Sequence, residues 1–261
     1  MKDILSEIIA NKRFEVDIQK RTITIEQLQD SFDNFQTQHS LSKALVASSS
    51  GIISEFKRRS PSKGWIKEGA LIEEIIPSYE SGGAAAISIL TDEKFFGGSL
   101  RDIKIARPLV NIPILRKDFI IDEYQLYQAK IVGADAILLI AAALEKEVCH
   151  ALAEKAHQLG LETLLEIHNI EELSYLSKNI DVIGINNRNL GTFFTDVENS
   201  FRLAEQLPQE AILVSESGIS NPETVKRLKK SGFRGFLIGE TFMKADNPGE
   251  ALRTFIHQIN V

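Results

Sequence analysis

The sequence has only one cysteine among its 261 residues, so no disulfide can form within the chain. This residue, Cys149, lies in LEKEVCHALAEKAHQLG, which has the pattern of an amphipathic helix, and we interpret it as a packing residue rather than a nucleophile. The five histidines are scattered, and no Cys/His cluster has the spacing of metal ligands. We therefore expect neither a disulfide framework nor a metal site.

Long apolar runs and an excess of basic residues are also missing. No stretch of about eighteen uncharged apolar residues occurs, and the N-terminal MKDILSEIIANKRFEV lacks the apolar core of a signal peptide. The chain has 30 Lys and Arg against 36 Asp and Glu, a net charge of -6, which argues against sequence-independent nucleic-acid binding. We expect a cytoplasmic protein with no membrane or nucleic-acid partner.

Short apolar runs rich in Ile, Val and Leu recur along the chain, which is 43% hydrophobic and long enough for a large core. Eight such runs start roughly 20–35 residues apart, a spacing that suits one strand and one helix per unit. The runs are GIISEF (51–56), AAISIL (85–90), IPILRKDF (112–119), ADAILLIA (134–141), ETLLEI (162–167), DVIGIN (181–186), AILVSES (211–217) and RGFLIGE (234–240).

The segments between these runs have helical patterns. AKIVGA and HQLGLE place glycine where a helix ends, and SNPETVKRLKKSGF has a polar start, an early proline and basic residues in its last turn. Apolar strands alternating with amphipathic helices predict a parallel sheet covered by helices. Eight evenly spaced units favour a closed (β/α)8 TIM barrel over a doubly wound open sheet. We expect residues 1–261 to form a single domain, with residues 1–46 as an N-terminal helical extension packed against the barrel.

Polar residues follow several of the predicted strands. In barrels of this kind the active site lies at the carboxyl ends of the strands. Strand side chains alternate between two faces, so Glu55 and Lys57 face the barrel mouth if Phe56 packs under the helices. A single charge at a strand end is often only solvated, but five polar residues from five strands that converge on one rim indicate a site. These are Lys57, Lys117, Glu166, Asn186 and Glu216.

Two further features of the rim concern phosphate and an aromatic ring. SESGIS (215–220) and IGETFM (238–243) place Gly218 and Gly239 after the seventh and eighth strands, the corner where barrels often bind phosphate. Apolar residues near the rim either pack the loops or form a wall for a ring. His168 follows Glu166 by two residues, but such a pair does not make a metal site, and we favour a loop role for His168.

Together these residues resemble the indole-3-glycerol-phosphate synthase family over nearly the whole chain. The resemblance rests on EFKRRSPSKG (55–64), LTDEKFFGGS (90–99), PILRKDFIID (113–122), LLEIHN (164–169), GINNRNL (184–190), VSESGI (214–219) and FLIGETFM (236–243), and ILSEIIANKRFEV looks like the family's added helix. It implies a carboxy-lyase of tryptophan biosynthesis that needs no metal or organic cofactor. The implied substrate is a phosphorylated small molecule, 1-(2-carboxyphenylamino)-1-deoxyribulose 5-phosphate. We expect a monomer or a weak homo-oligomer.

The resemblance also implies a role for each site residue. Lys117 corresponds to the general acid of ring closure, and Glu166 to the carboxylate that moves a proton during dehydration. Lys57 corresponds to the lysine that pairs with the substrate carboxylate and is also proposed as an acid in the later step. The remaining implied positions are supporting carboxylates (Glu55, Glu216), groups that bind substrate hydroxyls (Asn186, Ser217), an arginine near the site (Arg188), a phosphate site (Ser60, Gly218, Gly239 and the backbone of Glu240) and a ring enclosure (Phe96, Phe119, Pro61, Leu138, Leu190).

Two other interpretations of the sequence stay open. One is a phosphoribosyl anthranilate isomerase, which is expected to use a Cys and an Asp at strand ends, whereas the lone cysteine here lies in a predicted helix. The other is a non-catalytic barrel that binds a phosphorylated metabolite or a partner enzyme. Loss of Lys117 or Glu166 would have favoured that interpretation, and the chain contains both residues.

Overall fold

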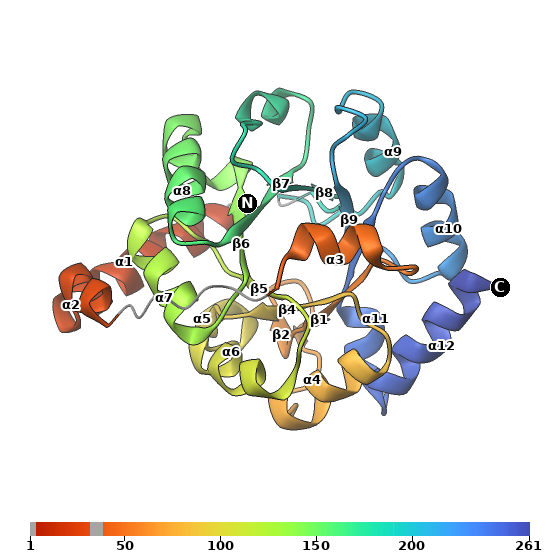
Figure 1. The fold of residues 1–261 in the computed structure, drawn as a ribbon, viewed down its shortest axis with the longest axis horizontal. Helices are drawn as coiled ribbons and strands as arrows, with labels where there is room; N and C mark the ends of the chain where they lie inside the picture. Colours follow the sequence, from red (N-terminus) through yellow and green to blue (C-terminus); the bar gives the residue numbers. More distant parts are fainter. Residues whose placement is uncertain (1–3, 32–38, 190) are drawn as a thin grey trace.

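Eight parallel strands form the centre of the molecule in a computed structural model that describes residues 4–31, 39–189 and 191–261. They hydrogen-bond in the order β1, β10, β9, β8, β7, β6, β5, β4, and β4 pairs with β1 to close a barrel (Figure 1). This confirms the predicted (β/α)8 barrel and excludes the open sheet. The barrel strands are β1 (Ile52–Phe56), β4 (Ala86–Leu90), β5 (Ile114–Lys117), β6 (Ala136–Ile140), β7 (Glu162–Ile167), β8 (Val182–Asn186), β9 (Leu213–Glu216) and β10 (Gly235–Ile238), and a short hairpin of β2 (Arg59–Ser60) and β3 (Gly64–Trp65) follows β1.

Helices surround the barrel and also precede it. The described residues before β1 form α1 (Ile4–Thr22), α2 (Ile25–Asp30) and α3 (Leu41–Ala47). The others follow the strands: α4 (Ile72–Ser81), α5 (Glu93–Phe96), α6 (Leu100–Ala106), α7 (Glu123–Val132), α8 (Lys146–Gln158), α9 (Glu198–Ala204), α10 (Pro222–Lys230), α11 (Glu240–Met243) and α12 (Pro248–Asn260), with 3-10 turns at Arg107–Leu109, Ala141–Ala143 and Glu171–Tyr175. The expectation of a helix between all strands is wrong between β7 and β8. This short connection, which the structure describes in full, contains the 3-10 turn Glu171–Tyr175 and no α-helix. None of the described helices is both long and apolar enough to span a bilayer.

The helix ends that the sequence predicted have the expected local causes. The Asn221 side chain caps α10 by accepting a hydrogen bond from the Glu223 N–H, and Pro222 begins that helix. Gly133 ends α7 with φ +91°, a left-handed conformation that most residues with a Cβ adopt only at a cost.

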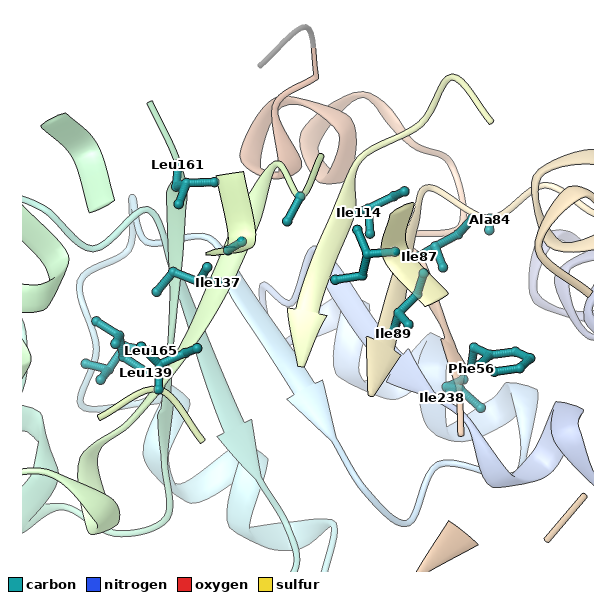
Figure 2. Packing of buried hydrophobic residues seen from close by; sticks show 14 of the residues in the cluster. Phe56, Ala84, Ile87, Ile89, Ile114, Ile137, Leu139, Leu161, Leu165 and Ile238 are labelled. Carbon is teal, nitrogen blue, oxygen red and sulfur yellow. The ribbon is translucent and has the colours of Figure 1, made fainter. Parts of the chain in front are cut away.

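The two faces of each strand pack into two different cores. Ile53, Leu115 and Leu164 point into the barrel and form an inner core with residues of the other strands. The alternate residues pack outward against the helices, and Figure 2 shows this for Ile87 and Ile89 on β4 and for others around the barrel. Phe56 belongs to this outer layer, as predicted, so Glu55 and Lys57 are directed to the barrel mouth.

The N-terminal helices cover both ends of the barrel. Leu41 and Leu45 of α3 pack with the inner core, and Glu162, at the start of β7, accepts hydrogen bonds from Ser40 Oγ (2.6 Å) and Ser42 N (2.8 Å) at the start of α3. Helix α3 therefore closes the amino end of the barrel (Figure 1). Helix α1 contributes side chains to the pocket at the opposite end.

A buried ion cluster fixes α1 at that opposite end. Lys12 of α1, whose side chain is only 5% exposed, places Nζ 2.9 Å from Asp92 Oδ2, 3.0 Å from Asp118 Oδ1 and 2.8 Å from Glu15 Oε2. Burial lowers the pKa of Lys12, but Asp118 and Asp92 outweigh it and raise that pKa above its usual value. Asp118 also receives the Arg116 guanidinium at 2.9 Å, so the network continues into β5.

Replacing Lys12 tests how far this cluster stabilises the molecule. Lys12→Met keeps most of the side-chain volume but leaves the two buried aspartates with one cation fewer. We expect it to lower the free energy of unfolding by about 3 kcal/mol in a urea titration, since breaking a buried ion pair from one side is strongly destabilising. Lys20→Met is the matched control on the same helix, because Lys20 pairs with Asp122 at 2.6 Å where both side chains are about a third exposed, and such pairs contribute at most about 1 kcal/mol. Equal effects of the two substitutions would contradict the prediction.

Candidate active site

A pocket of about 530 Å³ opens at the carboxyl ends of the barrel strands. All the predicted site residues that the structure describes line it; Leu190 is the one that lies outside the described residues. The structure therefore brings together Glu55, Lys57, Ser60, Pro61, Phe96, Lys117, Phe119, Leu138, Glu166, Asn186, Arg188, Glu216, Ser217, Gly218, Gly239 and Glu240.

Lys117, at the end of β5, is the centre of a charged cluster in the pocket that also contains Glu55, Glu166 and Glu216. Its Nζ lies 3.0 Å from Glu166 Oε2 on β7 and 3.3 Å from Glu216 Oε2 on β9, and its side chain is 13% exposed. Burial lowers the pKa of Lys117, but the charges of Glu166, Glu216 and Glu55 outweigh burial and raise it above its usual value. Lys117 is therefore a largely buried cation that lines the pocket.

Glu166 and Glu216 share Lys117 but differ in their other partners. Burial raises the pKa of Glu166, but Lys117 and His168 outweigh it, and the net pKa is lowered. The pKa of Glu216 is raised by burial and by repulsion from Glu166 and Glu55, with Lys117 opposing. Glu216 Oε1 has no hydrogen-bond partner among the described residues. The two carboxylates are thus suited to different protonation states in one site.

Two glycines that the sequence argument did not use in this way make room for the carboxylates. A Cβ on Gly184 would lie 2.2 Å from Glu216 Oε1 and 2.7 Å from Leu164 Cδ2. A Cβ on Gly239 would lie 2.4 Å from Glu55 Oε1. Each acid therefore occupies space that a larger residue would fill at Gly184, on the neighbouring strand β8, or at Gly239, directly after the neighbouring strand β10.

Lys57 and Arg188 lie on the rim of the pocket. Lys57 Nζ donates to Glu55 Oε1 at 2.5 Å, so an acid from its own strand holds this cation. Arg188 Nη1 donates to Ser62 Oγ at 2.9 Å, which joins the segment after β8 to the segment after β1. The Arg188 N–H also donates to Asn186 Oδ1 at 3.0 Å.

The corner predicted to bind phosphate contains unusual backbone and additional cations. Ser217 (φ +67°) and Gly218 (φ +75°) are both left-handed, and a serine in that conformation is uncommon. The Glu240 carboxylate accepts hydrogen bonds from Lys63 Nζ (2.8 Å) and Lys244 Nζ, which together lower its pKa to about 2 against the effect of burial. Neither lysine is predicted as a pocket residue from the sequence, because Lys63 lies in a loop and Lys244 at the end of a helix.

An apolar wall faces the charged cluster. Phe96 and Phe119 have ring centroids 6.0 Å apart, and Leu138 lies with them in the pocket lining. Helix α1 adds Ile4 and Ile8 to this lining. The sequence did not indicate whether residues 1–46 approach the site, and the structure shows that part of them does.

His168 follows β7 and lies in a loop, as expected, but its ring also contacts the cluster. Its Nε2 is 3.3 Å from Glu166 Oε1, and its Nδ1 is 3.5 Å from Glu172 Oε2. Burial lowers the pKa of His168, and the two carboxylates outweigh burial and raise it. The loop interpretation therefore missed a contact with a central site residue.

Two other kinds of reactive side chain bear on function, namely potential metal ligands and the single cysteine. No set of three or more His, Cys, Asp or Glu side chains that could hold a metal ion occurs in the described part of the chain. Cys149 is fully buried in α8, and burial raises the pKa of its thiol to about 11, so it is a packing residue as predicted.

A buried cluster of lysines and carboxylates, beside a glycine-containing corner and at the carboxyl ends of eight parallel strands, defines the class of protein: a (β/α)8-barrel enzyme for an anionic substrate. Solved structures agree on the fold. The chain is similar to thiamine phosphate pyrophosphorylase from Pyrococcus furiosus (TM-score 0.62, 18% identity, covering 85% of this chain and 98% of that one). It is also similar to tryptophan synthase subunit alpha from Legionella pneumophila (TM-score 0.62, 14% identity, covering 84% and 98%).

Sequence comparison identifies the family. The family model for indole-3-glycerol phosphate synthase matches residues 5–255. The chain is 73% identical over 259 residues to indole-3-glycerol phosphate synthase of Bacteroides thetaiotaomicron (99% of this chain, 100% of the relative), and 42% identical over 256 residues to that of Burkholderia ambifaria (97% and 98%). The chain belongs to the indole-3-glycerol phosphate synthase family, and its activity is that of a carboxy-lyase in tryptophan biosynthesis.

Enlarging Gly184 tests the geometry of the cluster. Gly184→Ala would push the Glu216 carboxylate away from Lys117, and we expect kcat to fall about a hundredfold, since displacements near 1 Å in an active site have effects of this size. Gly69→Ala is the matched control, because Gly69 is exposed and an added Cβ there meets no atom within 4 Å. Thermal unfolding of both variants separates a local displacement from a loss of folding. Full activity of folded Gly184→Ala would show that Glu216 does not need its present position.

Proposed function

We propose that the pocket binds 1-(2-carboxyphenylamino)-1-deoxyribulose 5-phosphate and that Lys117 is the general acid for its ring closure. The products are indole-3-glycerol phosphate, carbon dioxide and water. The observation that carries this assignment is the position of Lys117 Nζ, which lines the pocket while two buried carboxylates hold it at 3.0 and 3.3 Å. A preorganised cation of this kind stabilises an oxyanion where it forms.

The two anionic groups of the substrate lie at different parts of the rim in this proposal. The phosphate binds beside Ser60, Gly218 and Gly239, since glycines allow a phosphate to approach the backbone closely and since Lys63 and Lys244 add positive charge. The Glu240 side chain repels an anion, so Glu240 contributes through its backbone. The substrate carboxylate pairs with Lys57, which exchanges part of its contact with Glu55 for the ligand.

The apolar wall then positions the aromatic ring. Phe96, Phe119 and Leu138 enclose the ring on one side, with Pro61 at the exposed edge. Asn186, Ser217 and Arg188 surround the sugar chain, and the first two hydrogen-bond its hydroxyl groups. This arrangement holds the ring carbon close to the C2 ketone, which is the geometry that a bond-forming step requires.

Ring closure follows from this placement. The ring carbon that carries the carboxylate attacks the C2 ketone, and the carbonyl oxygen takes a proton from Lys117 as the new carbon–carbon bond forms. Loss of carbon dioxide leaves its bonding electron pair in the ring and restores aromaticity there. Glu216, with its raised pKa, can return a proton to Lys117 across 3.3 Å.

Dehydration completes the indole. The hydroxyl formed from the ketone leaves as water, with Lys57 as the acid near the rim, and Glu166 accepts the proton lost from the adjacent carbon. Glu166 is ionised when the substrate binds, because Lys117 and His168 lower its pKa against the effect of burial, and an ionised carboxylate is able to accept this proton. We assign no step to a metal ion or an organic cofactor.

The wider setting of the enzyme is also a proposal. Helix α1 contributes to the pocket together with the barrel strands, which supports one domain over residues 1–261. A phosphorylated substrate does not cross a lipid bilayer readily, which supports a cytoplasmic enzyme. We propose a monomer or a weak homo-oligomer, since every part of the proposed mechanism comes from one chain.

The role of Lys117 is testable by substitution. Lys117→Ala removes the acid while the phosphate corner stays intact, so we expect kcat to fall by at least about a hundredfold and the binding of a phosphate-containing substrate analogue to change little. Lys146→Ala, at the exposed start of α8, is the control for loss of a lysine. Unchanged turnover of Lys117→Ala would eliminate the proposed role. A loss of analogue binding equal to the loss of turnover would show that Lys117 acts mainly in binding.

A direct assay tests the reaction and its independence of metal ions together. The purified enzyme is mixed with 1-(2-carboxyphenylamino)-1-deoxyribulose 5-phosphate in a buffer with a metal chelator, and the indole absorbance is followed. We expect the absorbance to rise at the same rate as without the chelator. Activity only without the chelator would assign a metal to the site, and no activity in either buffer would favour a barrel that binds the compound without converting it.

A further inference from the structure

The loop after β7 contains an ion-pair chain that the proposed mechanism does not use. It runs from Glu166, in the cluster, through the His168 ring to Glu172 in the 3-10 turn. His168 has a side-chain exposure of 12% and does not line the pocket, so it is positioned to act on Glu166 rather than on substrate. Neither ring nitrogen has another hydrogen-bond partner among the described residues.

The outer member of this chain is rigidly held. Glu172 Oε2 accepts the His168 backbone N–H at 2.6 Å, and Glu172 Oε1 accepts from Asn169 Nδ2 at 2.9 Å. The Asn199 side chain donates to the His168 carbonyl oxygen at 3.1 Å, so α9 also fixes this part of the loop. The imidazole therefore has a defined position between two carboxylates, where its cationic form is favoured.

The two oxygens of Glu166 face different cations. Oε2 faces Lys117 at 3.0 Å, and Oε1 faces His168 at 3.3 Å. The other charged groups at Lys117 are Glu216 and Glu55, which are acids. When Lys117 gives its proton to the substrate, Oε2 loses its cation until Glu216 returns a proton to Lys117, and during that interval His168 is the cation that remains beside Glu166.

We propose that His168 is a positioning residue that keeps Glu166 ionised and oriented after Lys117 has donated its proton. Its cation, held by Glu172, prevents Glu166 from taking up a proton before the dehydration step. This inference rests on the proposed role of Glu166 as the proton acceptor of dehydration. It assigns a function to a residue that the sequence alone suggested was only part of a loop.

The test compares His168→Gln with the unmodified enzyme. Gln retains a hydrogen-bond donor but has no charge, so the pKa of Glu166 should rise and the acid limb of the kcat profile should move toward neutral pH by about one unit. We expect kcat on the plateau to fall about tenfold, as a partial loss of proton-transfer catalysis, with KM little changed. A merely structural role would lower kcat or stability without moving the acid limb.

A single-turnover experiment identifies the affected step. Carbon dioxide release reports decarboxylation, and indole absorbance reports dehydration. In His168→Gln we expect the absorbance to lag behind carbon dioxide release, because only the later step depends on Glu166 as a base. Simultaneous signals would overturn the proposal.

Two further variants separate the failure of this inference from the failure of the proposed function. Glu166→Gln should be nearly inactive. If it is active, Glu166 is not the base, and the proposed roles of Glu166 and of His168 are both wrong. If Glu166→Gln is inactive while His168→Gln keeps its acid limb and shows no lag, only the role of His168 falls. His257→Gln, which removes an exposed histidine of α12, is the control for histidine loss.

A measurement without substitution covers the case in which His168→Gln does not fold. The imidazole of His168 can be titrated by nuclear magnetic resonance in the unmodified protein. We expect it to be charged at pH 7.5. An unperturbed histidine, with a pKa of about 6.5, is mostly neutral at that pH. A neutral ring at that pH would overturn the proposal.

Discussion

The site depends on one buried cation, Lys117, and on the acids that surround it. An ammonium group removed from water is unstable unless partners replace its hydration, and here Glu166 on β7 and Glu216 on β9 act as these partners. Their arrangement also leaves the lysine in contact with the pocket. The same charge balance that allows burial of Lys117 therefore makes it available to a substrate.

The residue directly after β5, Asp118, belongs to a different ion-pair network. Lys117 Nζ pairs with Glu166 and Glu216, whereas the Asp118 carboxylate pairs with Arg116 and Lys12. The end of β5 thus takes part in two sets of ion pairs. One set belongs to the proposed catalytic site, and the other joins the barrel to α1. This explains why a helix far away in the sequence belongs to the site: it is attached one residue from the proposed acid and forms part of the wall.

The sequence predicted the strands and most of the pocket because both depend on local rules. Apolar runs at regular intervals located all eight barrel strands, and the alternation of faces placed Glu55 and Lys57 at the mouth. The resemblance to a family supplied the implied roles. Other features depend on distant partners: the Lys12 cluster joins residues that are far apart in sequence, and the direction of the His168 ring after the strand end is not set by strand alternation. The missing helix between β7 and β8 also escaped prediction, because the surrounding repeat suggested one.

The contact between Gly184 and Glu216 has an evolutionary consequence. The two residues are on adjacent strands, and the acid fills the space that a side chain at position 184 would need. A larger residue at 184 fits the barrel only when the acid at 216 is shortened or moved and the Leu164 side chain also shifts. Among proteins descended from this fold, positions 184 and 216 should therefore change together. Where the reaction is lost and position 216 no longer carries an acid, position 184 can hold an apolar side chain.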